Sequence, residues 1–282
     1  MKIKLGKEFV FTTELGGIKG VLLEDSIAKA KDFKGLDALN VHDCPGANLR
    51  INSIMAASIL QKELEITTIP HFACRDRSLL GMQADLLGAH ALGIRYILPT
   101  TGDGPQHGPF QASSGVYDYN TVELMGIIDK LNQGVDSNGK EYGGKTEFVI
   151  SATATPQTKN LEKELNRMQK KIEAGADFFQ TQAAYDPEKI KIFVDKAKSL
   201  GKPILLGIMP LKSPKMASFV SNIPGITIPE KIMRQLEAGK SGFEIATEFI
   251  AEVHELVDGL HIFGMGDVGI TNKIIEFTKE LI

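Results

Sequence analysis

The chain has 282 residues, with 32 Lys and Arg against 35 Asp and Glu, so its formal net charge is −3. Charged residues make up 24% of the chain and hydrophobic residues 43%, a balance typical of globular proteins. These numbers exclude disordered, collagenous and disulfide-rich classes, and they disfavour a nucleic-acid binder that depends on bulk positive charge.

Eight short segments rich in β-branched and aromatic residues recur along the chain, separated by segments with helical spacing. Several of them are almost continuously apolar, as parallel strands covered on both faces are. In chain order, strands are predicted at Phe9–Glu14, Leu36–Asp43, Ile66–Cys74, Ile94–Thr100, Glu147–Thr153, Phe178–Gln182, Pro203–Met209 and Leu260–Gly264.

Apolar residues three and four positions apart predict helices between these strands, at Asp76–Leu92, Asn160–Ala174, Pro187–Leu200 and Phe243–Val257. Gly93, Gly175 and Gly201 are expected to end the first three. Most strand starts are separated by close to the ~30 residues of a βα unit. Two intervals are longer, and they contain Gly102–Ser114 with Asn132–Thr146, and Pro214–Glu237.

Eight such units predict an α/β protein, a single (β/α)8 TIM barrel that spans residues 1–282 as one catalytic domain. An open doubly wound sheet is the alternative. The N-terminal segment contains no long apolar run, so we expect neither a signal peptide nor a membrane span. We therefore expect a cytoplasmic protein. Cys44 and Cys74 cannot supply the four ligands of an iron–sulfur cluster, and we interpret them as small buried thiols at neighbouring strand ends.

Polar residues gather at the C-terminal ends of the predicted strands, where a barrel places its chemistry. They are Glu14, His42, Asp43, His71, Arg75, Asp76, Asp103, Thr153, Thr155, Gln182 and Asp267. Asp76 is interpreted as the N-cap of the helix that follows it. Glu14 follows an apolar strand, so we expect burial to raise the pKa of its carboxyl and suit it to acid catalysis.

These strand ends allow two other interpretations, a metal site and a dinucleotide-binding turn. Glu14, His42, Asp43, His71 and Asp103 could form a metal site, although no pair has the HxH or HxxxH spacing of common ligand pairs, so no metal is predicted. The string GMGDVG at residues 264–269 matches a dinucleotide fingerprint, but only thirteen residues follow it. That leaves no room for the next strand and its acidic residue, which excludes the fingerprint.

Two long strings carry a resemblance to a known family. HFACRDRSLLGMQADLLGAHALGIRYILPTTGDGP at residues 71–105 resembles the third and fourth units of methylenetetrahydrofolate reductases, and KIEAGADFFQTQAAYD at residues 171–186 resembles the sixth. FTTEL around Glu14, LLGIMPL at Leu205–Leu211 and IPGITIPEKIM at Ile223–Met233 extend the resemblance over nearly the whole chain. The length matches the bacterial catalytic barrel without the regulatory domain of animal forms.

The resemblance implies a flavoprotein that reduces 5,10-methylenetetrahydrofolate to 5-methyltetrahydrofolate by hydride transfer from reduced flavin, in one-carbon metabolism and methionine biosynthesis. The flavin would be FAD, or else FMN, with NADH or NADPH as electron donor. Glu14 matches the glutamate that protonates the folate ring nitrogen, Asp103 the aspartate beside flavin and pterin, and Gln182 the glutamine that binds substrate. Flavin contacts carry over to His71, Gly102, Asp103, Tyr117, Glu164 and Lys171.

In this resemblance Lys171 would meet the flavin diphosphate and Glu164 the ribose, whereas without it the two would be a solvated pair on one helix face. The chain departs from well-studied members at His42-Asp43-Cys44, at Thr101, at Ser213-Pro214 and at GMGD in residues 264–267. This variant resembles reductases of anaerobic one-carbon metabolism. The expected partners are therefore folate, an electron-transfer subunit and further copies of the chain.

Two rival functions remain open. The first is a folate-binding methyltransferase barrel that acts with a corrinoid partner and without flavin. The second is a non-catalytic or regulatory barrel, which the polar strand ends disfavour.

Overall fold

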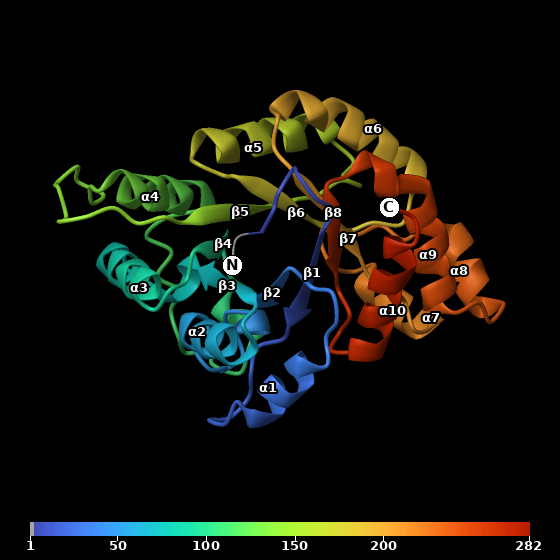
Figure 1. Cartoon of the computed structure of the whole chain (residues 1–282), viewed down its shortest axis with the longest axis horizontal. Helices are drawn as coiled ribbons and strands as arrows, with labels where there is room; N and C mark the ends of the chain where they lie inside the picture. The colour runs from blue at the N-terminus through green and yellow to red at the C-terminus, as the bar shows by residue number, and fades with distance from the viewer. Residues whose placement is uncertain (1–2) are drawn as a thin grey trace.

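Eight parallel strands pair in chain order and close into a barrel, because β1 pairs with both β2 and β8 (Figure 1). The structure is a computed structural model that describes residues 3–282. It confirms the predicted (β/α)8 architecture, and the open sheet is wrong. The strands are β1 (Val10–Leu15), β2 (Ala38–Val41), β3 (Thr67–Ala73), β4 (Tyr96–Thr100), β5 (Val149–Ala154), β6 (Phe178–Ala183), β7 (Ile204–Ile208) and β8 (Gly259–Ile262).

Helices surround the strands on the outside of the barrel (Figure 1). Gly93, Gly175 and Gly201 follow three of them with φ of 87°, 103° and 65°, as predicted for glycines at helix ends. The segment Pro214–Glu237 forms two extra helices. The helices are α1 (Glu24–Lys31), α2 (Ser53–Leu64), α3 (Leu79–Ala91), α4 (Thr121–Gln133), α5 (Leu161–Glu173), α6 (Pro187–Ala197), α7 (Pro214–Val220), α8 (Glu230–Glu237), α9 (Gly242–Val253) and α10 (Val268–Lys279). None of those described is long and apolar enough to cross a membrane.

The prediction that Asp76 caps the third helix is wrong. Residues Cys74–Asp76 form a turn of 3₁₀ helix, so α3 begins only at Leu79. Ser78 is its N-cap and accepts a hydrogen bond from the backbone N–H of Gly81. The carboxylate of Asp76 is instead paired with Arg75.

The lower half of the barrel interior is apolar. Val10, Ala38 and Phe178 pack there together with Ile69 and Leu205. Successive side chains of a strand point to opposite faces, so the residue two positions further along each strand also points inward. The inward face therefore continues from this apolar layer into residues 12, 40 and 180, and then into residues 14, 42 and 182.

Three aspartates fasten the chain at the opposite end of the barrel. Each lies just before a strand and accepts a hydrogen bond, 2.8 Å long, from a backbone N–H of a strand. The pairs are Asp37 with Phe11, Asp177 with Ile150, and Asp258 with Ile204. These carboxylates hold the fold and lie away from the C-terminal strand ends, so they are no part of the candidate site.

Candidate active site

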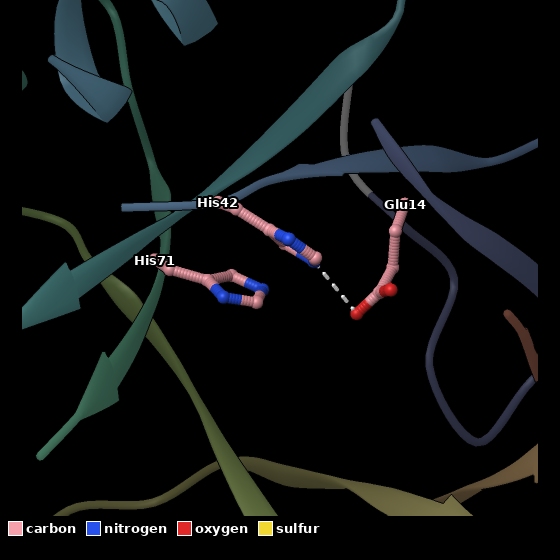
Figure 2. Close-up of side chains that lie close together, drawn as sticks. All are labelled: Glu14, His42 and His71. Carbon is pink, nitrogen blue, oxygen red and sulfur yellow. Dashed lines mark ion pairs between the residues drawn. The ribbon is translucent and has the colours of Figure 1, made fainter. Parts of the chain in front are cut away.

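Ionisable side chains from three neighbouring strands meet at the mouth of the barrel. Glu14 lies near the end of β1, His42 follows β2 directly, and His71 lies in β3. Figure 2 shows the two imidazole rings side by side, with Glu14 facing them; the ring centroids are 4.7 Å apart. The strand ends therefore bring these three residues together, as the sequence predicted.

Two histidines contact one oxygen of Glu14. Its Oε1 lies 3.0 Å from Nε2 of His42 and 3.4 Å from Nε2 of His261 on β8. Burial alone would raise the pKa of Glu14, but both imidazoles favour its ionised form, and the pKa lies well below its usual value. The predicted rise is therefore wrong. Burial also opposes a charge on His42, yet Glu14 raises the pKa of that imidazole above its ordinary value.

A layer of hydrogen-bonded side chains, none of them among the residues predicted from the sequence, lies beneath the mouth. Nε2 of Gln180 lies 3.1 Å from both Thr12 Oγ1 and His261 Nδ1, and its Oε1 accepts a bond from Ser151. Asn40 joins this layer through Gln180. The available signal was alternation, since residues 12, 40 and 180 each precede a predicted mouth residue by two positions.

Asn40, in the layer beneath the mouth, keeps the imidazole of His71 neutral. Nδ2 of Asn40 lies 3.2 Å from its Nε2, and because an amide N–H can only donate, Nε2 of His71 is the acceptor. Burial lowers the pKa of His71 to about 3, and the neighbouring charge of His42 acts in the same direction.

Glu14, His42 and His71 form a group whose possible ligand atoms all lie within 4.8 Å of one another. The other two residues of the metal hypothesis are engaged elsewhere. Asp43 pairs with Arg77, and Asp103 accepts a bond from the backbone N–H of Gly46. Nε2 of His71 lies at hydrogen-bond distance from Asn40, and Nε2 of His42 pairs with Glu14, so a metal bound through these atoms would have to displace both contacts. We assign no metal to this group.

Gly102 and Asp103 form a turn after β4, against the end of β3. Gly102 has φ of +83°, and a Cβ atom there would lie 3.0 Å from Cβ of Arg75, so the position favours glycine. The buried guanidinium of Arg75 donates to the carbonyl oxygen of Asp103 over 3.0 Å. The charge of Asp103 also helps to raise the pKa of His42, which places this carboxylate at the rim of the mouth.

Gln182 and Tyr117, two further predicted site residues, lie outside the turn formed by Gly102 and Asp103. Gln182 lies in β6, and within residues 3–282 its side-chain amide has no hydrogen-bond partner. Tyr117 is 38% exposed with φ of +46°, on a loop that the hydrogen bond from Val116 N to Arg75 O fastens to the rim. Both side chains are therefore accessible to a ligand.

Glu164 and Lys171 are buried on α5, so the alternative of a solvated pair is wrong. Nζ of Lys171 donates to the carbonyl and hydroxyl oxygens of Thr153 at the end of β5, and burial lowers its pKa to about 8. Glu164 accepts from the backbone N–H of Thr155 and pairs with Arg167. Glu164 also lines a hollow of about 810 Å³ whose cationic residues are Lys163, Arg167 and Lys170.

The loops that follow β7 and β8 are tied together. Nζ of Lys212 lies 2.8 Å from Oδ2 of Asp267, and Asp267 also caps α10. The GMGDVG string thus forms a strand-to-helix turn at the rim. β8, which precedes the string, pairs with β1 and closes the barrel, so the string belongs to a βα unit of the barrel and not to a dinucleotide-binding unit.

Neither cysteine forms a disulfide in the part of the chain that the structure describes. Cys74 is buried, as expected, and burial raises the pKa of its thiol to about 11. Cys44 is only partly buried, and its carbonyl oxygen accepts a bond from Arg75.

A closed (β/α)8 barrel with ionisable groups gathered at its C-terminal mouth places this protein in the class of TIM barrels. Residues 11–279 match the model of the methylenetetrahydrofolate reductase family, so the chain belongs to that family. The match confirms the resemblance that the sequence strings carried.

The relatives are distant. Methylenetetrahydrofolate reductase 1 of Schizosaccharomyces pombe is 25% identical over 236 residues, which cover 78% of this chain and 37% of that protein. The 5,10-methylenetetrahydrofolate reductase of Pectobacterium carotovorum is 26% identical over 190 residues, 65% of this chain and 56% of the relative. The chain therefore spans only part of the length of these curated relatives.

Among solved structures, an uncharacterized protein from Clostridium thermocellum that binds two copies of 5-methyl-5,6,7,8-tetrahydrofolic acid has a TM-score of 0.66. The similarity covers 95% of both chains at 15% sequence identity, so it shows the shared fold alone.

Proposed function

We propose that this chain catalyses the flavin-dependent reduction of 5,10-methylenetetrahydrofolate to 5-methyltetrahydrofolate. The observation that carries the proposal is the Glu14 carboxylate, which is held between two imidazoles at the barrel mouth of a chain matched to the reductase family over residues 11–279. A carboxylate beside a protonated base can deliver a proton to a bound substrate.

The residues around the mouth fit a flavin. Gly102 leaves the rim turn without a side chain, and Tyr117 offers an exposed ring on the next loop. The hollow beside Glu164 is lined by the cationic Lys163, Arg167 and Lys170 and by the anionic Glu162 and Glu164. Because Arg167 pairs with Glu164, the two lysines are the groups that would bind a dinucleotide diphosphate, which favours FAD over FMN. When bound, flavin would supply the hydride for the one-carbon unit.

The chain's own residues would orient the folate and hold the proton. Gln182 has an unused amide that can bind the pterin ring. Asp103 lies at the rim and can accept a bond from the pterin, while its charge disfavours further negative charge beside it. Glu14 would protonate the folate nitrogen whose bond to the one-carbon bridge opens.

Three similar proteins support the choice of substrate and electron donor. The barrel from Clostridium thermocellum binds 5-methyltetrahydrofolic acid, the product of the proposed reaction. A relative from Caenorhabditis elegans is named as NADPH-dependent and one from Arabidopsis thaliana as NADH-dependent, so NADH or NADPH is the proposed donor here. The remaining proposed partners are an electron-transfer subunit and further copies of this chain.

Absorption spectra and anaerobic turnover test this function. The purified protein, or the protein mixed with FAD or FMN, should show the absorption of bound flavin, which NAD(P)H or dithionite should bleach and methylenetetrahydrofolate restore. A folded protein that binds neither flavin contradicts the proposal. Methyl transfer from methyltetrahydrofolate to a corrinoid in such a colourless protein would establish the methyltransferase alternative.

A further inference from the structure

Three histidines surround Glu14, and their hydrogen bonds differ. From the layer beneath, Asn40 lies at hydrogen-bond distance from His71, and Gln180 and Thr12 lie at hydrogen-bond distance from His261. Among the described residues, the only hydrogen-bond or ion-pair partner of His42 is Glu14, and its ring packs against that of His71. This difference determines which imidazole can carry a proton.

His71 is a poor site for a positive charge, since an imidazolium needs an acceptor at both nitrogens. Its Nε2 faces the amide N–H group of Asn40 at 3.2 Å, so a second proton there would face a donor group in a buried place. His261 is a poor site for proton exchange with solvent, because its side chain is only 4% exposed. Its Nδ1 lies 2.8 Å from Thr12 Oγ1 and 3.1 Å from the amide nitrogen of Gln180, and its Nε2 lies further from Glu14 than that of His42 does.

His42 has neither constraint. Its Nε2 lies 3.0 Å from Glu14 Oε1, its side chain is 22% exposed, and no described residue bonds to its Nδ1, so water can reach that atom. The ionisable groups around it are Glu14 on β1, His71 on β3, His261 on β8 and Asp103 after β4. The two carboxylates favour a positive charge on His42, and His71 is neutral.

We propose that His42 stores the proton for folate reduction and passes it to the substrate through Glu14. This inference rests on the proposed function. The proton leaves Nε2 of His42 for Oε1 of Glu14, and Glu14 gives it to the folate nitrogen. The bond from that nitrogen to the one-carbon bridge then breaks, and its electron pair remains on the nitrogen. Water returns a proton to His42, so no oxidant or reductant is needed.

The pKa shifts of Glu14 and His42 agree with this transfer of the proton. Histidine contacts lower the pKa of Glu14, so this carboxylate is ionised at neutral pH and must first take up a proton from a neighbour before it can donate one. Glu14 raises the pKa of His42, which keeps the proton available on the pair above pH 6.5. His42 acts through Glu14 and is therefore a positioning residue. Its removal should change the pH dependence of folate reduction as well as its rate.

The kinetic test compares His42→Asn with Glu14→Gln and with His254→Asn, which changes a histidine before β8, at the opposite end of the barrel. His42→Asn should slow folate reduction at least about tenfold at pH 7.5, within the range for general acid catalysis. It should recover most of that loss near pH 5.5, where solvent protonates Glu14 directly. Glu14→Gln should stay slow at every pH, and His254→Asn should match the wild type. An equal loss for His42→Asn at every pH would overturn the relay.

A second readout needs no cofactor. The chain has six histidines, so ¹⁵N NMR can follow each ring of the ligand-free protein through a pH titration. One ring should titrate above pH 6.5, disappear in His42→Asn and titrate at lower pH in Glu14→Gln. The absence of such a ring overturns the relay even where the wild type reduces folate. If the His42 ring titrates above pH 6.5 but the wild type reduces no folate, the proposed function is overturned. The transfer of the proton from Glu14 to folate is then overturned as well.

Discussion

Asn40 on β2 and Gln180 on β6 exchange two amide hydrogen bonds inside the barrel. Nδ2 of Asn40 donates to Oε1 of Gln180 over 3.0 Å, and Nε2 of Gln180 donates to Oδ1 of Asn40 over 3.1 Å. This reciprocal pair fixes the orientation of both amides. As a result, the N–H group of Asn40 faces Nε2 of His71 and keeps that ring neutral, and the amide nitrogen of Gln180 lies 3.1 Å from Nδ1 of His261.

The first prediction concerns the stability of that pair. Gln180→Leu leaves Oδ1 of Asn40 and the hydroxyl of Ser151 as unpaired buried groups, each of which costs about 1–3 kcal/mol. The free energy of unfolding should fall by at least about 2 kcal/mol in urea titrations. Gln169→Leu on the exposed face of α5 should stay within about 0.5 kcal/mol of the wild type. Equal stability of the two variants would show that the amide pair is dispensable.

The second prediction separates the two halves of the reaction. Glu14→Gln keeps the size of the side chain but removes the acid, so flavin binding and reduction by the donor should be near normal. Reoxidation by methylenetetrahydrofolate should slow by about 10²–10⁴-fold. Stopped-flow absorbance measures each half separately. If both halves slow equally, Glu14 serves the structure or the flavin, and its assignment as the acid is wrong.

The third prediction concerns acid stability. The pKa of His71 is about 3 in the folded protein and about 6.5 when unfolded, so between these values the unfolded chain binds more protons. Stability should therefore fall as the pH drops through this window, with a slope of up to about 1.4 kcal/mol per pH unit from this one ring. His71→Asn should show a shallower decline than the wild type between pH 6.5 and 4, while the exposed His107→Asn should not. Parallel declines would mean that His71 is charged in the folded protein.

The fourth prediction distinguishes two neighbouring lysines. Lys171→Met removes an ammonium that holds the end of β5, so urea titrations should show a loss of about 1–3 kcal/mol. Lys170→Met should leave stability within about 0.5 kcal/mol but weaken flavin binding, because Lys170 lines the hollow. Fluorescence titration with FAD measures the affinity. If Lys171→Met is stable and binds flavin poorly, Lys171 meets the diphosphate directly.

The fifth prediction concerns metals. Because Asn40 occupies Nε2 of His71, prolonged dialysis against EDTA should leave folate reduction unchanged. A loss of activity that one divalent metal restores would establish Glu14, His42 and His71 as a metal site.

The barrel could be predicted because each βα unit is encoded locally. The apolar strands, the helical spacing and the glycines that end three helices all lie within about 30 residues of one another. The positions of Glu14, His42 and His71 followed from the rule that parallel strands of a barrel end on one side.

The charge state of Glu14 could not be predicted in this way. Its partner His261 lies 247 residues away, and sequence spacing does not report a contact between the first and last strands. The burial of Lys171, in contrast, had a readable signal. Glu164, Met168 and Lys171 follow steps of four and three, so all three lie on the face of α5 that the apolar Met168 turns toward the barrel.

The pairing of β1 with β8 also determines the stage of protein synthesis at which the groups around Glu14 can come together. Thr12 lies opposite His261 across this seam, and Glu14 receives its second imidazole from the same strand. Contacts of such long sequence separation form late in folding. A nascent chain that has not yet released residues 259–262 therefore lacks the complete set of groups around Glu14. Catalysis would begin only after the barrel has closed, which makes turnover a direct assay of that final step.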